Sequence, residues 1–437
     1  MPTAKVVPKH TDSNGWWATK PSEPFVSPKP SGEIRVQTAI IGGGICGVST
    51  ANRLGELRPN DRICLIDAER IGFGASGRNA GFMLNVHSHG PPKAIDILRR
   101  NINLWETGLN SLRKKVEQWQ IQCDWSEFGR IYGAAGPVGE KHIDEIAETL
   151  DKLGHKYKWY SQSDMEGRIG TKFYGRGLHA EGSALVNPAA LMVGLARNLP
   201  PNVDVYENTS VQQFERVGKS FRITTDHGII YADRIVLSAG VFIRQFGIAK
   251  NTFVPMATYG SLTGVLDDAA ISQLGAGKEF GILGASDYGA TIRLTQNRQL
   301  FIRNMFNFVP GAPLSGEKVK HISRLHREAM TKRWPGLADV PFEHSWGGIM
   351  AFTLNNGTVF GEYEPGIYVV LTNDVSPMTR GEAAGALMAE YMEGLDSDLL
   401  AVQLSIPNAK TLPPRPFLDL GIGVRKALLR LAARREF

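Results

Sequence analysis

The sequence predicts an α/β fold, and three observations near its start support this. Residues 36–41 form a β-branched apolar run, which is typical of a buried strand. The run ends in Gly42, Gly44 and Gly47, spaced G-x-G-x-x-G, and a helical stretch follows. Residues 62–67 form a second apolar run that ends in an acid. Strand, glycine turn, helix and second strand together predict a nucleotide-binding unit.

The three glycines have separate expected roles in such a unit. Gly42 makes the tight turn, Gly44 lets a pyrophosphate approach the backbone, and Gly47 lets the helix pack close to the strand. The N-terminus of the helix, which includes Ile45 and Cys46, offers unpaired N–H groups and partial positive charge to the phosphates.

An acid at the end of the second strand completes the pattern. Asp67, which Ala68 follows, lies 20 residues after Gly47, where a carboxylate is expected to bind the ribose hydroxyls. The alternative is a glycine-rich turn in an unrelated α/β fold, but the second strand and its acid favour a nucleotide site. The sequence therefore predicts that the chain binds an adenine dinucleotide.

Length and composition limit the class of protein. At 437 residues the chain is longer than one hydrophobic core usually accommodates, so two domains are expected. The net charge of +6 is modest and no basic patch is interleaved with aromatic residues, so we expect no nucleic-acid partner. No apolar run approaches the roughly 20 residues that span a bilayer, and no secretory signal begins the chain.

The cysteines point to a reducing compartment. Cys46, Cys64 and Cys123 have neither metal-ligand spacing nor an even disulfide count. We therefore expect buried free thiols, no metal site and a cytoplasmic location.

A second glycine-dense loop follows the nucleotide unit at residues 71–82. Small residues such as Gly77 and Ala80 would let its backbone approach a flat cofactor, and Ser76, Arg78 and Asn79 supply hydrogen bonds. The alternative is a flexible surface loop.

The rest of the chain alternates helices, strands and glycine turns. We expect helices over 94–119, 141–153, 187–199, 317–333 and 378–392, strands over 203–211, 221–225, 228–232, 234–240 and 366–372, and a hairpin over 290–303. Ser376 and Pro377 make a good N-cap and N1 pair, with Met378 and Thr379 in the turn that follows. Because helix N-termini stabilise negative charge, this turn is a candidate electrostatic element of an active site. An ordinary capped helix is an equal alternative.

The end of the chain is basic. Residues 423–435 predict a short amphipathic helix, with Val424, Ala427, Leu428 and Leu431 on one face. Such a helix could lie on a membrane surface. Docking on its own subunit or on a neighbour is favoured, because the apolar face is short.

The glycine fingerprint, Asp67 and the loop Gly-Ala-Ser-Gly-Arg-Asn-Ala-Gly at 74–81 occur in one order, and with them the chain resembles the FAD-dependent D-amino acid oxidase/glycine oxidase superfamily. Within it the chain is most similar to the γ-glutamylputrescine oxidase-like branch. The other segments that carry the resemblance are 16–17, 185–191, 209–211, 232–240, 292–301 and 346–353.

The resemblance implies a Rossmann-like FAD-binding domain with an inserted, mainly antiparallel substrate domain, α/β in class and α+β taken as a whole. The implied FAD-binding domain comprises residues 1–95, 185–250 and 345–405, the substrate domain 96–184 and 251–344, and a basic tail 406–437. Non-covalent FAD is expected, because no cysteine follows the last strand.

The resemblance also implies contacts to FAD. Gly42, Gly44 and Gly47 would face the pyrophosphate and Asp67 the ribose. The remaining implied FAD contacts are Ile45, Cys46, Ala68, Ser76, Gly77, Arg78, Asn79, Ala80, Val211 (by the adenine), Ala239 and Gly240. Arg293 matches the arginine that takes a substrate carboxylate in glycine oxidase-like members, and the alternative for it is a solvated residue of an edge strand. The other catalytic candidates are Ser376, Met378 and Thr379.

The implied reaction is oxidation of a C–N bond of an amine or amino acid. Hydride would pass to the flavin, water would hydrolyse the imine, and O2 would accept the electrons to give H2O2. Two departures, Arg303–Asn304 in place of Gly-Gly and the altered turn at 373–379, leave alternatives open. These are a dehydrogenase that uses a quinone or carrier protein, a flavin-binding protein without turnover and, more distantly, an NAD-dependent dehydrogenase. A homo-oligomer is also compatible with the sequence.

Overall fold

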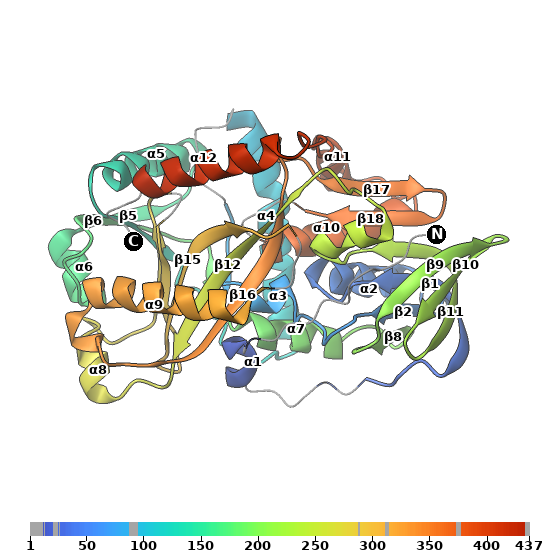
Figure 1. The fold of residues 1–437 in the computed structure, drawn as a ribbon, viewed down its shortest axis with the longest axis horizontal. Helices are drawn as coiled ribbons and strands as arrows, with labels where there is room; N and C mark the ends of the chain where they lie inside the picture. Colours follow the sequence, from blue (N-terminus) through green and yellow to red (C-terminus); the bar gives the residue numbers. More distant parts are fainter. Residues whose placement is uncertain are drawn as a thin grey trace.

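The computed structural model describes residues 12, 14–20, 25, 27–86, 95–286, 289–310, 314–372 and 377–432. Within these residues two eight-stranded sheets lie side by side, each covered by helices (Figure 1). The first sheet is on the right of the figure and the second on the left. The predicted α/β class, with a second and mainly antiparallel sheet, is confirmed.

The first sheet contains the predicted nucleotide unit. Its strand order is β17-β18-β11-β1-β2-β8, with the antiparallel pair β9–β10 attached to β11. The strands are β1 Gly32–Ile41, β2 Ile63–Ile66, β8 Val203–Tyr206, β9 Val211–Val217, β10 Ser220–Thr225, β11 Gly228–Leu237, β17 Val359–Glu364 and β18 Ile367–Leu371. β1, β2, β8, β11 and β18 run parallel. Their apolar runs are continuous because both faces of the sheet are covered.

Helices cover one face of the first sheet. α2 Ile45–Leu57, α4 Ile95–Gln118, α7 Pro188–Arg197 and α10 Pro377–Met392 form one apolar core with β1 and β2. α10 lies so close to α2 that a Cβ at Gly385 would approach the Cys46 carbonyl oxygen to 2.4 Å. The opposite face packs against the β9–β10 pair and the 3-10 turn Gly240–Phe246.

The second sheet has the order β16-β12-β15-β14-β13-β4-β6-β5. Its strands are β4 Arg130–Ala134, β5 Tyr157–Ser161, β6 Arg176–Ala180, β12 Val254–Thr263, β13 Phe280–Gly284, β14 Thr291–Leu294, β15 Leu300–Phe308 and β16 Phe342–Phe352. All neighbours are antiparallel except β4 and β13. α9 Gly316–Arg333 covers one face and α5 Pro137–Leu153 the other. The division of the chain into two domains stays a prediction.

The remaining elements are short or peripheral. They are α1 Gly15–Thr19, α3 Ala75–Arg78, the pair β3 Phe82–Met83 and β7 Ala184–Leu185, α6 Gln162–Ile169, α8 Asp268–Ser272, the 3-10 turn Pro335–Leu337, α11 Asp398–Leu404 and α12 Phe417–Ala432. α1 inserts Trp16 between Phe301 and Trp346, where the indole is almost fully buried.

Three predicted elements differ from the structure. The strand predicted over 203–211 is two strands, because the chain turns at Asn208, which has a φ of 47°. The strands predicted over 228–232 and 234–240 are one, since the ladder with β1 continues through this segment to Leu237. The last helix begins at Phe417, directly after Pro416, rather than at residue 423.

Candidate functional site

A cavity lies at the carboxyl ends of the parallel strands of the first sheet. It contains about 1350 Å³ of space that no protein atom fills, part of it open to solvent. Ile41, Ile66 and Leu371, the last residues of β1, β2 and β18, line it. Ligands of open α/β sheets bind at this edge, where the connections leave the strands. Ile349, Met350 and Ala351 of β16 add a wall from the second sheet.

The glycine turn lines the cavity and packs closely against residues 238 and 239. Gly42 has a φ of 114°, and a Cβ there would come within 2.6 Å of the Ala239 backbone nitrogen. Ser238 Oγ donates to the Gly42 carbonyl oxygen at 2.8 Å. A Cβ at Gly47 would lie 1.9 Å from the same carbonyl oxygen. The close packing predicted for Gly47 is therefore present in the structure.

The N-terminus of α2, which carries the partial positive charge of the helix, faces the cavity. The N-cap is Gly44, which has no side chain to accept the first N–H groups of the helix. The Ile45 N–H donates to Ser76 Oγ at 2.9 Å, which ties the second glycine loop to this turn. Gly44, Ile45, Cys46 and Ser76 all line the cavity. An uncapped helix N-terminus in such a place suits a phosphate.

Asp67 lines the same cavity and lies next to the glycine turn. Its Oδ2 accepts the Gly43 N–H at 2.6 Å, and its Oδ1 accepts the Glu69 N–H at 2.8 Å. Burial raises the pKa of this carboxyl above its usual value, while these two N–H groups act in the opposite direction. Each carboxylate oxygen has more than one lone pair, so Asp67 can also accept hydroxyl groups from a ligand in the cavity.

The second glycine loop is ordered rather than a free surface loop. The guanidinium of Arg78 is buried and donates to the Phe73 and Gly347 carbonyl oxygens and to Asp12. The Asn79 amide forms its hydrogen bonds within the loop. Its Nδ2 donates to the Ser76 carbonyl oxygen, and its Oδ1 accepts from the Gly81 N–H. Arg78 Nε and Nη1 and the Asn79 amide therefore bond to the protein in this structure, whereas Arg78 Nη2 has no hydrogen-bond partner among the described residues.

The predicted cofactor residues fall into two groups. Those that line the cavity are Gly42, Gly44, Ile45, Cys46, Asp67, Ala68, Ser76, Val211, Ala239 and Gly240. Those outside its lining are Gly47, Gly77, Arg78, Asn79 and Ala80. Further lining residues that the sequence did not single out are Glu69, Thr209, Ser210, Ser238, Phe242, Gln245, Met350 and Thr372. The rule that ligands bind at strand ends would have found Ser238 and Thr372, whereas Met350 was included only in the 346–353 segment that carries the resemblance, with no role of its own.

The catalytic candidates on α10 lie mostly behind the cavity. Pro377 lines it, but Met378 is buried in the core beneath α2, and Thr379 donates its hydroxyl to the Leu84 carbonyl oxygen at 2.9 Å. Ser376 lies outside the described residues. The structure thus places the start of α10, rather than these two side chains, at the cavity.

Arg293 is fully buried, and its two Nη atoms contact the protein, whereas its Nε has no hydrogen-bond partner among the described residues. Its Nη1 donates to the carbonyl oxygens of Val186 at 2.6 Å and Ala80 at 3.2 Å. Its Nη2 lies 3.9 Å from Glu279 Oε1, and its guanidinium stacks over Trp16. Burial lowers the pKa of this guanidinium to about 10, and Glu279 and Asp124 counteract that effect. In this structure Arg293 holds the second glycine loop against the second sheet.

The guanidinium of Arg303 lies in a different environment from that of Arg293. In the sequence this residue stood out only because Arg303–Asn304 replaces the Gly-Gly of the family hairpin. Among the residues that the structure describes, its guanidinium meets the ring of Phe306 at 5.0 Å and has no hydrogen-bond or ion-pair partner. Burial lowers its pKa to about 10, so it is still a cation at neutral pH.

The strand register places Arg303 on the same face of the second sheet as Trp346 and Met350. Arg303 is opposite Gly260, and Gly260 is opposite Trp346. Side chains alternate along a strand, so Met350 shares the face of Trp346. Met350 lines the cavity. Ile349 and Ala351, whose side chains lie on the other face, line the cavity as well, and Arg303 is not among the lining residues.

A dinucleotide cradle that faces an antiparallel sheet defines a class of flavin-dependent oxidoreductases. The family described as DAO, FAD dependent oxidoreductase, matches residues 37–391, and the chain belongs to this family. The cavity fits its cofactor, FAD, because a glycine turn, an uncapped helix N-terminus and a strand-end carboxylate meet there.

Individual relatives are distant but cover most of the chain. The oxidoreductase OrdL of Rhizobium meliloti (strain 1021) is 25% identical over 402 residues, 90% of this chain and 91% of that protein. The gamma-glutamylputrescine oxidoreductase of Escherichia coli (strain K12) is 23% identical over 406 residues, 89% and 91% of the two chains.

Solved structures share the fold. Glycine oxidase from Geobacillus kaustophilus superposes with a TM-score of 0.70 at 17% identity, over 85% of this chain and 99% of that one. L-Amino acid deaminase from Proteus myxofaciens gives a TM-score of 0.69 at 17% identity, over 90% and 96%. The predicted resemblance to this superfamily is confirmed.

Proposed function

We propose that this chain oxidises a C–N bond of an amine or amino acid that also carries an anionic group, with FAD as cofactor and O2 as final acceptor. The observation that carries the proposal is the cavity itself, a dinucleotide cradle with a wall from the second sheet, together with Arg303 of that sheet, which has no hydrogen-bond or ion-pair partner among the described residues. The gamma-glutamylputrescine oxidoreductase, the glycine oxidase and the L-amino acid deaminase are all named for amine or amino-acid substrates.

The first sheet supplies the cofactor site. The backbone at Gly42, Gly44 and Ile45 would hold the pyrophosphate, and Asp67 would accept the ribose hydroxyls. Val211 would lie by the adenine, and Ala239 and Gly240 by the ribityl chain. FAD, when bound, supplies a two-electron acceptor for hydride.

The start of α10 would tune the reaction electrostatically. Pro377 lies at the cavity, and the partial positive charge of a helix N-terminus stabilises negative charge nearby. This is the role that the sequence predicted for the turn, and it depends on the backbone rather than on the side chains of Met378 and Thr379.

The second sheet would position the substrate. Arg303 would bind its anionic group, since a cation that has no partner among the described residues gains most from an external anion. The amine must be neutral for hydride to leave the adjacent carbon. The C–H bond breaks, a C=N bond forms, and water hydrolyses the resulting imine to a carbonyl compound and an amine.

Absorbance spectroscopy of the purified holoprotein tests this function. We expect a two-band flavin spectrum, FAD released intact by acid precipitation, and anaerobic bleaching by an amine that bears a carboxylate. Rapid recovery of the colour in air, with H2O2 formed, supports O2 as acceptor. Slow recovery in air but fast recovery with a quinone would instead support a dehydrogenase. A colourless protein that cannot be reconstituted with FAD would overturn the proposal.

A further inference from the structure

The last helix has an apolar face that none of the described residues covers. α12, Phe417–Ala432, lies along the outer edge of the molecule, above the second sheet in the view of Figure 1. The large apolar residues of its outer face are between 53% and 70% exposed, and they are Phe417, Leu420, Val424, Leu428 and Leu431. Their spacing of three and four residues places them in one stripe along the helix.

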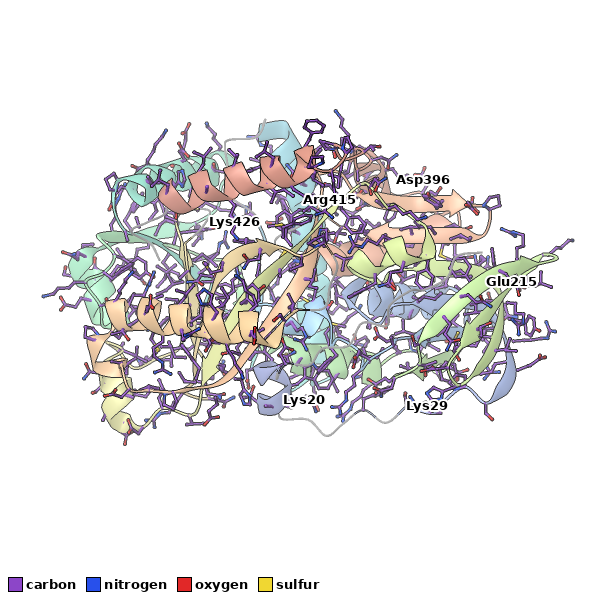
Figure 2. The ribbon with its side chains drawn as sticks, viewed as in Figure 1. Lys20, Lys29, Glu215, Asp396, Arg415 and Lys426 are labelled. Carbon is purple, nitrogen blue, oxygen red and sulfur yellow. The ribbon has the colours of Figure 1, made fainter. Side chains whose placement is uncertain are left out.

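The opposite face holds the helix on the body of the protein. Leu418 and Ile422 are half-buried. Lys426 Nζ donates to Asn307 Oδ1 of β15 at 2.5 Å, and Figure 2 labels Lys426 on the side of α12 toward the second sheet. Arg415, just before the helix, pairs with Asp419 at 2.7 Å. The expected docking on the same subunit is therefore present, but through this face. The face that the sequence suggested for docking, Val424 to Leu431, points outward instead.

Positive charge borders the exposed stripe. At 3.6 residues per turn, positions 425 and 430 fall on the two sides of the stripe, and both are arginine. Arg425 is exposed. Only one acid, Asp419, occurs within the helix, and Arg415 already neutralises it.

We propose that α12 binds the surface of a membrane that contains anionic lipids. The apolar stripe would enter the boundary between headgroups and acyl chains, while the exposed Arg425 beside it contacts the headgroups. Within the described residues no helix has both the length and the apolar content to cross a bilayer, so this contact lies in the plane of the membrane. Pairing of two α12 helices is less favourable, because it would bring the arginines of both copies to one interface.

Sedimentation of the FAD-loaded full chain with lipid vesicles tests this proposal. We expect binding to vesicles of phosphatidylcholine and phosphatidylglycerol in equal parts, weak binding to phosphatidylcholine alone, and release by high salt. The variant Leu420→Ser/Leu428→Ser should weaken binding by at least about tenfold, because two large apolar side chains no longer enter the lipid. Arg425→Gln should weaken it by about fivefold, as expected for one cation at an anionic surface.

A matched control is Leu354→Ser, which removes an equally exposed leucine, 57% accessible, from a turn far from α12 in sequence. It should bind vesicles like the parent protein. Retention of FAD by every variant shows that the fold is intact. Absence of binding to anionic vesicles, or binding that the double variant does not change, would overturn the proposal. A dimer in light scattering that the double variant converts to a monomer would overturn it in favour of a second copy as the occupant.

Discussion

Gly47 lies against Gly42 with no room for a side chain, since a Cβ at Gly47 would be 1.9 Å from the Gly42 carbonyl oxygen. The same Cβ would be 2.7 Å from Ser238 Oγ, which donates to that carbonyl oxygen. One pair of residues thus fixes both the approach of α2 to β1 and the shape of the turn that would hold the pyrophosphate. The cofactor site and the packing of the first sheet depend on the same contact.

Gly47→Ala should therefore damage FAD binding and stability together. Because the obstacle is a backbone atom, α2 has to move, and overpacking of this kind costs about 1–3 kcal/mol. We expect a lower ratio of flavin to protein absorbance after purification and a lower melting temperature.

The control for this variant is Gly167→Ala in α6. No atom lies within 4 Å of a Cβ at Gly167, so the change should stabilise the helix by roughly 0.5–1 kcal/mol and leave FAD content unchanged. A Gly47→Ala protein with full FAD content and an unchanged melting temperature would contradict the packing argument.

Asp67→Asn should weaken FAD binding by roughly tenfold to a hundredfold, the range for a hydrogen bond to a charged group. The carboxylate also accepts two backbone N–H groups, and an amide can accept from only one side. Titration of the cofactor-free protein with FAD, followed by flavin fluorescence, measures the change. Asp204→Asn, which removes only an exposed ion pair with Arg62, should bind FAD normally.

FAD affinity should also depend on pH through Asp67. Burial raises the pKa of this carboxyl, so without FAD the folded chain keeps its proton to a higher pH than the unfolded chain does. Ionisation therefore costs stability as the pH rises above the ordinary carboxyl range. Ribose hydroxyls favour the ionised form, so FAD affinity should rise with pH through the same window. The Asp67→Asn protein should lack this dependence, and an equal slope in both proteins would assign it to another group.

Cys46 should be unreactive although it lines the cavity. Burial raises the pKa of its thiol to about 12, and burial raises that of Cys123 to about 12 as well. Only the thiolate is a strong nucleophile. Iodoacetamide at neutral pH should therefore leave the native protein unlabelled by intact-mass measurement, whereas the denatured chain should take up three labels, one for each cysteine. Rapid labelling of Cys46 in the native, FAD-loaded protein would show that its thiolate is accessible.

Arg293, which is buried, and Arg303, which is half-buried, should respond differently to substitution. Arg303→Gln should raise KM for a carboxylate-bearing substrate by roughly tenfold to a hundredfold, with little effect on the matching amine without the carboxylate. Arg303→Lys should be intermediate, because it keeps the charge but not the planar fork. Arg293→Gln should instead lower FAD retention and the melting temperature, since the carbonyl oxygens of Ala80 and Val186 lose their donor.

Arg298→Gln, in the same hairpin, is the control, because it removes only an exposed pair with Asp268. It should leave both KM and the melting temperature unchanged. If Arg293→Gln rather than Arg303→Gln selectively raised KM, the expectation from the resemblance would hold and the assignment to Arg303 would fail.

The sequence by itself determined the nucleotide unit and the class of the fold. The strand, the glycine spacing, the helix and Asp67 follow one another within a short segment, so their geometry depends mainly on local backbone rules. The buried strands of the first sheet could be predicted for the same reason, since sheets covered on both faces require continuous apolar runs.

Only the tertiary structure decided which polar side chains are free to bind a ligand. Arg293 and Arg303 lie on adjacent strands and look alike in sequence, but carbonyl oxygens of two distant loops accept from Nη1 of the first, whereas the second has no hydrogen-bond or ion-pair partner among the described residues. Likewise, Met350 reaches the cavity, and α12 turns its apolar stripe outward, through contacts between segments far apart in the chain. Such contacts satisfy or expose a group according to which surfaces meet in space, and the spacing of residues along the chain does not encode that.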